Sequence, residues 1–459
     1  MIARMKTNKT GLGTFAFRCL CPIILLGMTT PCAAQQPWSL RQCIDYAVEH
    51  NIQVKKQDVT RLQREVDVNT AKNSRLPDLS GSVSENFSFG RGLTAENTYT
   101  NTNTSSTSFS LGTSVPLFTG FRIPRTLELQ KLNLEAANAD LEKAKNDIRM
   151  QVAQAYVQIL YSMELCDVAR RQVGIDSLHV FRLKEMMKNG KASGTEVVQQ
   201  EAAMAQSQLT VTQADNDYRL ALLTLSQLLE LPSPEGFTIE RVSPETLSLS
   251  SHLTGLSPDA IYQEALLVKP EIQAEQYRLE GTEKSIEIAK SAKLPSLSFQ
   301  AGLGSNYYKT SGFPSDGFFK QLNNNFSQYL GLSLNIPIFN RFETRNNIKN
   351  AQLSQYQQQL QFEQVKKGLY KEIQQAYYNA VASQAKYESS GEAKRSQEEA
   401  FRLMSAKYEY GKANITEFNE TKNNLMKAES DLARAKYEYL YQHALLDFYR
   451  GRDLTFQGL

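Results

Sequence analysis

An internal repeat covers most of this chain and limits the folds that it can adopt. VPLFTGF at residues 115–121 returns as IPIFNRF at residues 336–342, so that Pro116 and Pro337 lie 221 residues apart. VAQAYVQIL and NGKASGTE return at the same offset, as IQQAYYNAV and YGKANITE, and NSRLPDLSGSVS returns at an offset of 218 as SAKLPSLSFQAG. The sequence therefore predicts two tandem structural repeats. Because proline weakens strand pairing, Pro116 and Pro337 are predicted to mark strand-to-helix junctions.

Each copy starts with a helical segment and continues with two segments of alternating polarity. A Leu-Pro step ends the helices predicted over about 39–75 and about 258–293. Alternation with a period of two is typical of β-strands. It predicts strands over about 79–90 and 106–118 in the first copy, and over about 296–308 and 328–339 in the second. The polar runs between the strands, residues 97–108 and 309–328, are predicted to be loops.

After the repeated phrase, each copy changes to the period of a helix. Apolar residues recur every three or four positions over about 124–188 and about 343–409 without a proline. Each of these helices is predicted to be roughly 100 Å long. Each ends near a glycine, Gly190 or Gly411, after which a shorter helix runs back and completes a long hairpin. Alanines in the apolar stripes permit close packing of the helices, as in a coiled coil.

The N-terminus reads as a secretory signal peptide over residues 1–34, because basic residues precede a short apolar run and small residues precede Gln35. The predicted domains are then the first repeat at 35–231, an equatorial linker at 232–257, the second repeat at 258–450 and a C-terminal tail at 451–459. The signal carries four of the positive charges and no negative ones, so its removal changes the net charge from +3 to −1. A net charge of −1 argues against nucleic acid as a partner.

Four alternating strands in a secreted chain without a long apolar helix predict a membrane β-barrel. In lipid, only helices and closed barrels satisfy all backbone polar groups. Membrane barrels contain at least about eight strands, so four strands from one chain cannot close a barrel. A dimer and a trimer both satisfy this count, and the long helices would form a second, helical ring. A soluble sheet is the alternative for each strand taken singly. Glu85 falls on the face assigned to lipid, and the sequence offers no account of it.

From residue 38 to residue 450 the repeat, the strand pairs, the glycine turns and the linker resemble a TolC-like outer-membrane efflux protein. The resemblance implies a mixed α and β fold. Four transmembrane β-strands per chain would contribute to a trimeric 12-stranded outer-membrane β-barrel, continuous with a long periplasmic α-helical barrel. It also implies the exit duct of a tripartite efflux or type I secretion system that conducts substrates passively. The implied partners are two further copies in a homotrimer, outer-membrane lipid, a periplasmic membrane-fusion adaptor and an inner-membrane pump of RND, ABC or MFS type.

The two glycine turns are the candidate functional sites. Thr195 and Thr416 are predicted as helix N-caps, with Glu196 and Glu417 in the first turns that follow. Glu420 lies three residues after Glu417 and so shares its helix face. Two interpretations stay open. The acids cap the helices only, or they form a periplasmic gate, which the resemblance assigns to Glu417 and Glu420 and which would attract cations at a narrow mouth.

The resemblance also implies a network that ties neighbouring helices together at these tips. Glu196 and Tyr408 occupy the matching positions, and Lys412 lies beside Ala413, which replaces the arginine of the family. In the family the tips meet the adaptor. The candidate docking residues are therefore Asn189, Gly190, Lys191, Tyr410 and Gly411.

The sequence predicts no catalytic, metal or cofactor site, and the chain is not expected to be an enzyme. Its four histidines are scattered singly and lack metal-ligand spacing to Cys, Asp or Glu. Cys43 and Cys166 are predicted to be packed thiols or one disulfide. The alternative functions are a barrel-anchored surface adhesin or receptor, which the short polar loops disfavour, and a soluble coiled-coil scaffold, which the signal peptide disfavours.

Overall fold

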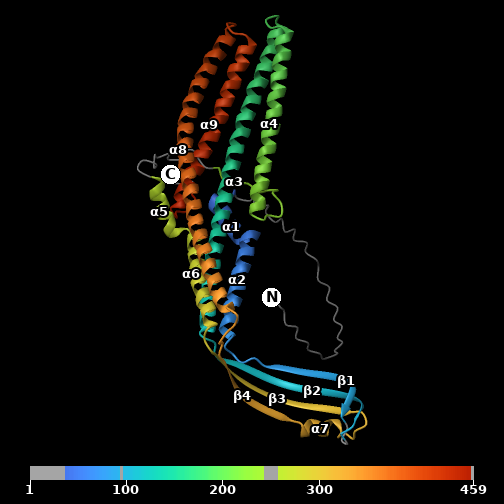
Figure 1. The fold of residues 1–459 in the computed structure, drawn as a ribbon. Helices are drawn as coiled ribbons and strands as arrows, with labels where there is room; N and C mark the ends of the chain where they lie inside the picture. The colour runs from blue at the N-terminus through green and yellow to red at the C-terminus, as the bar shows by residue number, and fades with distance from the viewer. Residues whose placement is uncertain (1–36, 94–96, 242–256, 456–459) are drawn as a thin grey trace, which may run out of the picture. The chain divides into compact units, whose positions relative to one another are not determined.

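The computed structural model describes residues 37–93, 97–241 and 257–455. The predicted signal peptide lies outside these residues, as do most of the predicted linker, from residue 242 to 256, and the last four residues of the predicted tail. The described chain combines long helices with one antiparallel sheet (Figure 1), which confirms the predicted mixed α and β class. Within the described ranges, no helix carries an apolar stretch that could cross a membrane.

The first helical segment of each copy is broken into two helices, where the sequence predicted one. The helices of the first copy are α1 (Leu40–His50) and α2 (Ile52–Asn73), and those of the second are α5 (Pro258–Val268) and α6 (Pro270–Ser291). Asn51 is extended and caps α2 through its side chain, which accepts a hydrogen bond from Gln53 N at 2.8 Å. Pro270 disfavours a helical conformation at the residue before it, and Lys269 is accordingly extended.

Two long hairpins make up most of the helical part (Figure 1). α3 (Arg122–Lys188) turns into α4 (Gly194–Leu228), and α8 (Glu343–Glu409) turns into α9 (Ile415–Tyr449). α3 and α8 contain 67 residues each, and α4 and α9 contain 35 each. α3 packs against α1, α2, α4, α6 and α9, whereas α8 packs against α5, α6 and α9. These contacts leave α2, α4 and α8 at the edges of the helical layer.

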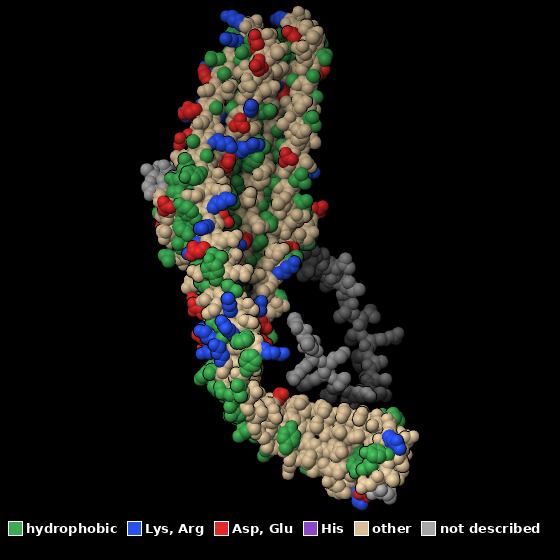
Figure 2. Space-filling view, viewed as in Figure 1, with side chains coloured by type: hydrophobic (Ala, Val, Ile, Leu, Met, Phe, Trp, Pro, Cys, Tyr) green, Lys and Arg blue, Asp and Glu red, His purple; other side chains and the backbone are tan. Residues whose placement is uncertain are grey.

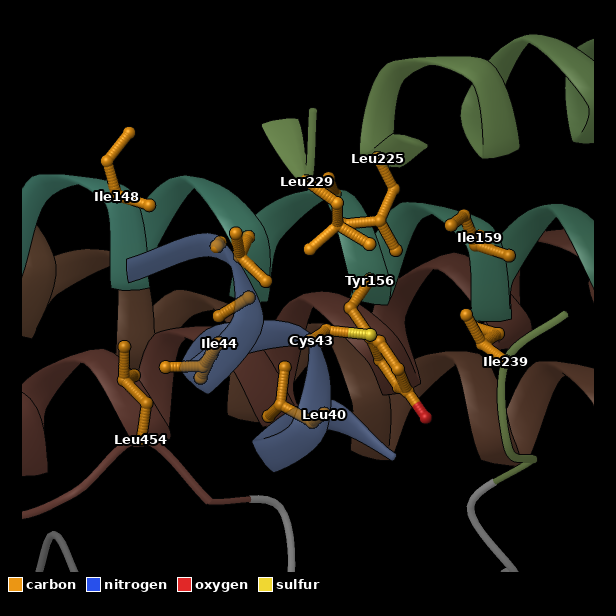
Figure 3. Packing of buried hydrophobic residues seen from close by; sticks show 14 of the residues in the cluster. Leu40, Cys43, Ile44, Ile148, Tyr156, Ile159, Leu225, Leu229, Ile239 and Leu454 are labelled. Atoms are coloured by element: carbon orange, nitrogen blue, oxygen red, sulfur yellow. The ribbon is translucent and has the colours of Figure 1, made fainter. Parts of the chain in front are cut away.

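The largest hydrophobic core lies where α1 packs against α3, α4 and α9 (Figure 3). Tyr156 of α3 is buried there, and its hydroxyl donates a hydrogen bond to Glu240 O at 2.8 Å. Trp38 and Ile239 form an isolated parallel bridge beside it. The described beginning of the predicted linker is therefore held against the core of the helical part.

Both cysteines of the described chain are buried free thiols, which selects packed thiols over a disulfide. Cys43 lies in the core shown in Figure 3, and Cys166 lies on α3. Burial raises the pKa of the Cys43 thiol to about 12. Because the thiolate is the reactive form, Cys43 is inert in the folded chain.

The sheet contains four antiparallel strands in the order β1-β2-β3-β4. Their bounds are Ser80–Leu93 for β1, Tyr99–Phe118 for β2, Ser296–Thr310 for β3 and Ser327–Asn335 for β4. β2 and β3 come from different copies and pair along most of their length. The registers place leucine, valine and phenylalanine on one face and mainly serine, threonine, asparagine and glycine on the other. In the view of Figure 2, charged side chains are scattered over the helices but are few on the visible face of the sheet.

The predicted loop at residues 97–108 is wrong, because β2 begins at Tyr99. Apart from Tyr99, this run consists of threonine, asparagine and serine, so it has no apolar face from which alternation could be read, although β-branched threonine suits a strand. In the second copy the predicted loop contains α7 (Phe318–Asn324). The Gln321 side chain bonds both the N–H and the C=O of Tyr308, each at 3.0 Å, so α7 satisfies backbone groups of β3 beyond the end of β4.

The two prolines of the repeated phrase lie differently with respect to the strands. β4 ends at Asn335, so Pro337 follows the strand, whereas the sequence predicted that the strand would continue to residue 339. Pro116 lies inside β2, opposite Ser298, at a register shift that ends the pairing by Phe118. Both positions suit a residue that cannot donate a backbone hydrogen bond.

Glu85 has partners that explain its place on the apolar face. Its carboxylate accepts hydrogen bonds from Ser105 Oγ at 2.6 Å and from Thr107 Oγ1, both on the neighbouring strand β2. A charged group on an apolar surface is tolerated when its oxygens are bonded in this way. Ser105 lies outside the strand predicted over about 106–118, and the sequence gives no register that places Thr107 opposite Glu85.

Candidate functional site

Both hairpins reverse through the same turn, at the same end of the helical part (Figure 1). Gly190 and Gly411 follow the ends of α3 and α8 with φ angles of 66° and 67°, in the left-handed region that favours glycine. The next N–H groups bond back into the preceding helices, from Lys191 N to Met186 O and from Lys412 N to Lys407 O, each at 2.8 Å. This pattern is the Schellman motif, which ends a helix cleanly.

The return helices begin with capping boxes. Ser193 caps α4 and Asn414 caps α9, so the prediction that Thr195 and Thr416 would be the N-caps is wrong. The helices start earlier than predicted because the side-chain oxygens of Ser193 and Asn414, two residues upstream, accept hydrogen bonds from Glu196 N at 3.2 Å and Glu417 N at 2.8 Å. Glu196 and Glu417 occupy the third helical position. Each accepts a hydrogen bond from the backbone N–H of its own cap residue, at 2.9 Å for Glu196 and 3.3 Å for Glu417.

The candidate gate and docking residues lie at the surface of the tips. Glu417 and Glu420 are both exposed, on the side of α9 away from buried Ile415 and Phe418. The candidate docking residues are likewise exposed: Asn189, Gly190, Lys191, Tyr410 and Gly411. Lys412 is exposed as well, and its side chain is not part of the core beneath the tips.

A small aromatic core lies directly beneath the tips. Phe418 of α9 is fully buried, and it stacks on Tyr408 with ring centroids 5.0 Å apart. The His179 ring lies tilted against it, with a centroid distance of 4.4 Å. The core is completed by Leu183, Val197, Ile415 and the partly buried Ala192 and Phe401. Burial raises the pKa of Tyr408, and the nearby Glu196 carboxylate adds to this shift. Tyr408 packs into this core, whereas Glu196 completes its capping box, and the network between them stays a prediction.

A buried ion pair joins the two hairpins below this core. Asp176 of α3 and Lys422 of α9 are almost fully inaccessible to solvent, and the Lys422 ammonium donates to an Asp176 carboxylate oxygen. The carboxylate also accepts from Gln200 Nε2 at 3.0 Å and from Ser207 Oγ at 2.6 Å, both on α4. Asn419 of α9 in turn donates to Gln200 Oε1 at 3.2 Å. Three helices therefore share one polar network.

Sequence reasoning missed this network, although each half left a signal. Asp176 occupies one place in a buried stripe of α3, between Gln172 and Val180, where the spacing calls for an apolar residue. Lys422 follows Ile415 and Phe418 on the buried face of α9 in the same way. Charged residues are almost never fully buried unless they are paired. Two such residues in one chain therefore indicate a pair, but only the fold brings them together.

The described residues contain no group of three or more His, Cys, Asp or Glu side chains placed to hold a metal ion. The tips thus present exposed acids and lysines above an aromatic core and a buried ion pair. Such an arrangement can attract or repel ions and can hold two hairpins in fixed positions.

Solved structures share this fold. CusC, whose structures were described in terms of transmembrane channel formation, superimposes with a TM-score of 0.74 at 18% identity, over 90% of this chain and 91% of that chain. The Campylobacter jejuni CmeC outer membrane channel gives a TM-score of 0.73 at 19% identity, over 91% of this chain and 86% of that one. The fold is therefore that of outer-membrane channels.

This chain belongs to the outer membrane efflux protein family, whose model matches residues 43–230 and again residues 261–452. Among its relatives, nodulation protein T of Rhizobium leguminosarum bv. trifolii is 23% identical over 418 residues, which cover 89% of this chain and 84% of the relative. The outer membrane efflux protein BepC of Brucella suis biovar 1 is 20% identical over 388 residues, which cover 84% and 79%. Membership confirms the predicted family, its efflux function and its location in the outer membrane.

Proposed function

We propose that three copies of this chain form one passive exit duct. Each copy contributes four strands to a 12-stranded barrel in the outer membrane and its helices to a ring in the periplasm. The duct receives substrates from an inner-membrane pump through a periplasmic adaptor and takes no nucleotide of its own. We also propose that the two halves of the chain are tandem repeats, which the matching helix lengths and the two matches of the family model support.

The observation that carries this proposal is a sheet with two different faces and two open edges. Within the described residues, β1 and β4 each pair with a strand on one side only. Exposed Val83, Phe87 and Leu332 lie on the apolar face, which suits lipid, whereas the other face is mainly Ser, Thr, Asn and Gly, which suits a water-filled lumen. In lipid an open edge leaves backbone groups without partners. Pairing of β1 with β4 of the next copy removes both edges.

The edge helices support the same assembly. Large apolar side chains remain exposed on α2, α4 and α8, which have neighbours on fewer sides than α3. They include Val59 and Val66 on α2, Val198 and Leu209 on α4, and Leu353, Leu360, Tyr378 and Val381 on α8. A row of this kind along an edge marks a surface that another protein surface covers. A neighbouring copy would cover it and continue the helical layer into a ring.

The tips are proposed to serve as the entrance and as the docking site for the adaptor. Three copies would bring six carboxylates, from Glu417 and Glu420, to one narrow mouth, where they would attract cations. Glu196, Tyr408 and Lys412 would tie each tip to its neighbour. Asn189–Lys191 and Tyr410–Gly411 are exposed where the adaptor would bind. Inside each copy, the Asp176–Lys422 pair would hold the second hairpin against the first.

Conductance in planar lipid bilayers tests the duct and separates the gate from capping. We expect the purified protein to form ion-conducting channels that prefer cations. Glu417→Gln combined with Glu420→Gln should lower this preference. Asn414→Ala removes the cap of α9 but keeps both acids, so it should leave the preference unchanged. Unaltered selectivity in the double Gln variant would refute the acidic gate, and the absence of any conductance would refute the duct.

A further inference from the structure

The polar face of the sheet carries one aromatic side chain among the described rows that β4 joins. From Ser296 to Gly304 of β3, the registers place serine, glycine, asparagine, glutamine and proline on this face, apart from Tyr329 of β4. Side chains of a strand normally stand roughly perpendicular to the sheet. Tyr329 in that orientation would project further from the wall than any of its neighbours in these rows.

Tyr329 instead lies across the wall. Gly302 is its direct partner on β3, and a Cβ atom added to Gly302 would lie 2.6 Å from Cε1 and 2.8 Å from Cζ of the tyrosine ring. The hydroxyl reaches towards β2, where it lies 3.9 Å from the Cβ position of Gly112. The ring therefore covers the glycines of its row. Tyr329 remains 58% exposed, so the ring is open on the side away from the sheet.

We propose that Gly302 keeps the duct wide by giving Tyr329 a place to lie flat against the wall. This inference rests on the proposed function, in which the polar face lines the lumen and three copies of this row form a ring. Glycine weakens a strand because it packs no side chain, and an aromatic partner across the sheet compensates for this loss. Here the same contact also removes the bulk of three tyrosines from the path of the substrate.

Alanine at position 302 would displace the ring and leave the backbone in place. The closest atoms belong to the far end of a side chain that can rotate about χ1. Because the backbone of the sheet lies beneath the ring, the ring turns away from the wall and into the lumen. Gly304 is a matched control on the same face. A Cβ there would lie 3.5 Å from Phe109 O and 3.7 Å from Ser327 Oγ, which are ordinary contact distances.

The test uses a reporter thiol beyond this row, on the side of the helices. Ser333→Cys places it on the polar face of β4, four residues from Tyr329 and about 13 Å along the strand. Ser333 is exposed, whereas the native thiols Cys43 and Cys166 are buried and give little background. Intact cells that carry the full chain are treated from outside with maleimides bearing polyethylene glycol of increasing length. The rate of labelling is measured for each reagent.

With Gly302→Ala we expect labelling by the long reagents to slow several-fold, while the shortest maleimide reacts as before. Gly304→Ala should leave all rates unchanged. Gly302→Ala combined with Tyr329→Ser keeps the added methyl group but removes the ring, so it should restore the rates of the long reagents. Unslowed labelling in Gly302→Ala overturns the proposal, as does slowing that persists in the double variant.

Tyr329→Ser alone tests the same point without any change at Gly302. A ring that already lies flat blocks little, so we expect unchanged rates. A several-fold acceleration would mean that the ring projects into the lumen, and the proposal would then be wrong. A reporter that even the shortest maleimide cannot reach in the otherwise unchanged chain would contradict the duct itself. The two proposals therefore fail in different ways.

Discussion

At the scale of single residues, the buried pair of Asp176 and Lys422 joins the two hairpins below the tips. Lys422→Met leaves a buried carboxylate without its cation, a change that costs about 3–5 kcal/mol in buried pairs. We expect amide hydrogen exchange to accelerate in the first turns of α9 and in α3 around Asp176. Asp176→Asn combined with Lys422→Met leaves no buried charge and should recover part of this loss. Exchange at the wild-type rate in the Lys422→Met variant would contradict a structural role for the pair.

His179 makes the same region sensitive to pH. Burial lowers its pKa, and the positive charges of Arg182 and Lys422 lower it further. Because the unfolded chain takes up this proton first as the pH falls, the contribution of His179 to stability is complete above its usual pKa of about 6.5. It is lost as the pH falls from there toward the lower pKa of the folded state.

Hydrogen exchange at the tips, followed from about pH 7.5 to about pH 5.5, measures this loss once the intrinsic pH dependence of exchange is removed. We expect the free energy of local opening to decrease over this range. His179→Gln cannot take up a proton, so it should flatten the profile. A profile that stays the same in this variant would assign the pH dependence to another group.

Some residues of the site could be predicted from the sequence and others could not, because the first follow local rules and the others depend on distant partners. Gly190, Gly411, Glu196 and Glu417 follow local rules for helix ends, which can be read within a few residues of chain. Asp176 has partners on α4 and α9 that lie 24 or more residues away along the chain. No local rule connects such positions, so only the packed fold could show the network.

At the scale of elements, the capping boxes fix where the return helices begin. Ser193→Ala and Asn414→Ala each remove a side-chain acceptor for the first turn, which costs about 1 kcal/mol. We expect faster hydrogen exchange in the first turn of α4 or α9, respectively. Thr195→Ala and Thr416→Ala are the matched controls, since these threonines lie inside the helices and should change exchange little. A larger effect at the threonines than at the caps would contradict the observed helix starts.

The elements also differ in how far their sequences predict them. The long helices could be read because their apolar stripes persist over many turns. β2 was predicted too short because its first half alternates threonine with asparagine and serine, and so carries no apolar signal. The breaks at Asn51 and Lys269 were missed because the apolar period continues on both sides of them.

At the scale of the whole molecule, the described part of the chain has surfaces that suit a neighbouring copy. The sheet has two open edges, its two faces differ in polarity, and the edge helices expose apolar rows. The strand count from the sequence allowed a dimer or a trimer. The resemblance read from the sequence implies the trimer that we propose. The central claim is therefore that β1 of one copy pairs with β4 of the next in a closed ring of three.

Disulfide cross-linking between these edges tests the claim most directly. Ser84→Cys on β1 is combined in turn with cysteine replacements from Ser327 to Asn335 on β4, and the protein is oxidised in the native outer membrane. We predict that at least one pair yields covalent dimers and trimers, with the trimer as the largest product. In the control, Ser108→Cys on β2 replaces Ser84→Cys in the same combinations. Because β2 is paired on both sides, the control should yield no covalent dimer or trimer. Products larger than a trimer, or no product from any β1 and β4 pair, would contradict the closed ring of three.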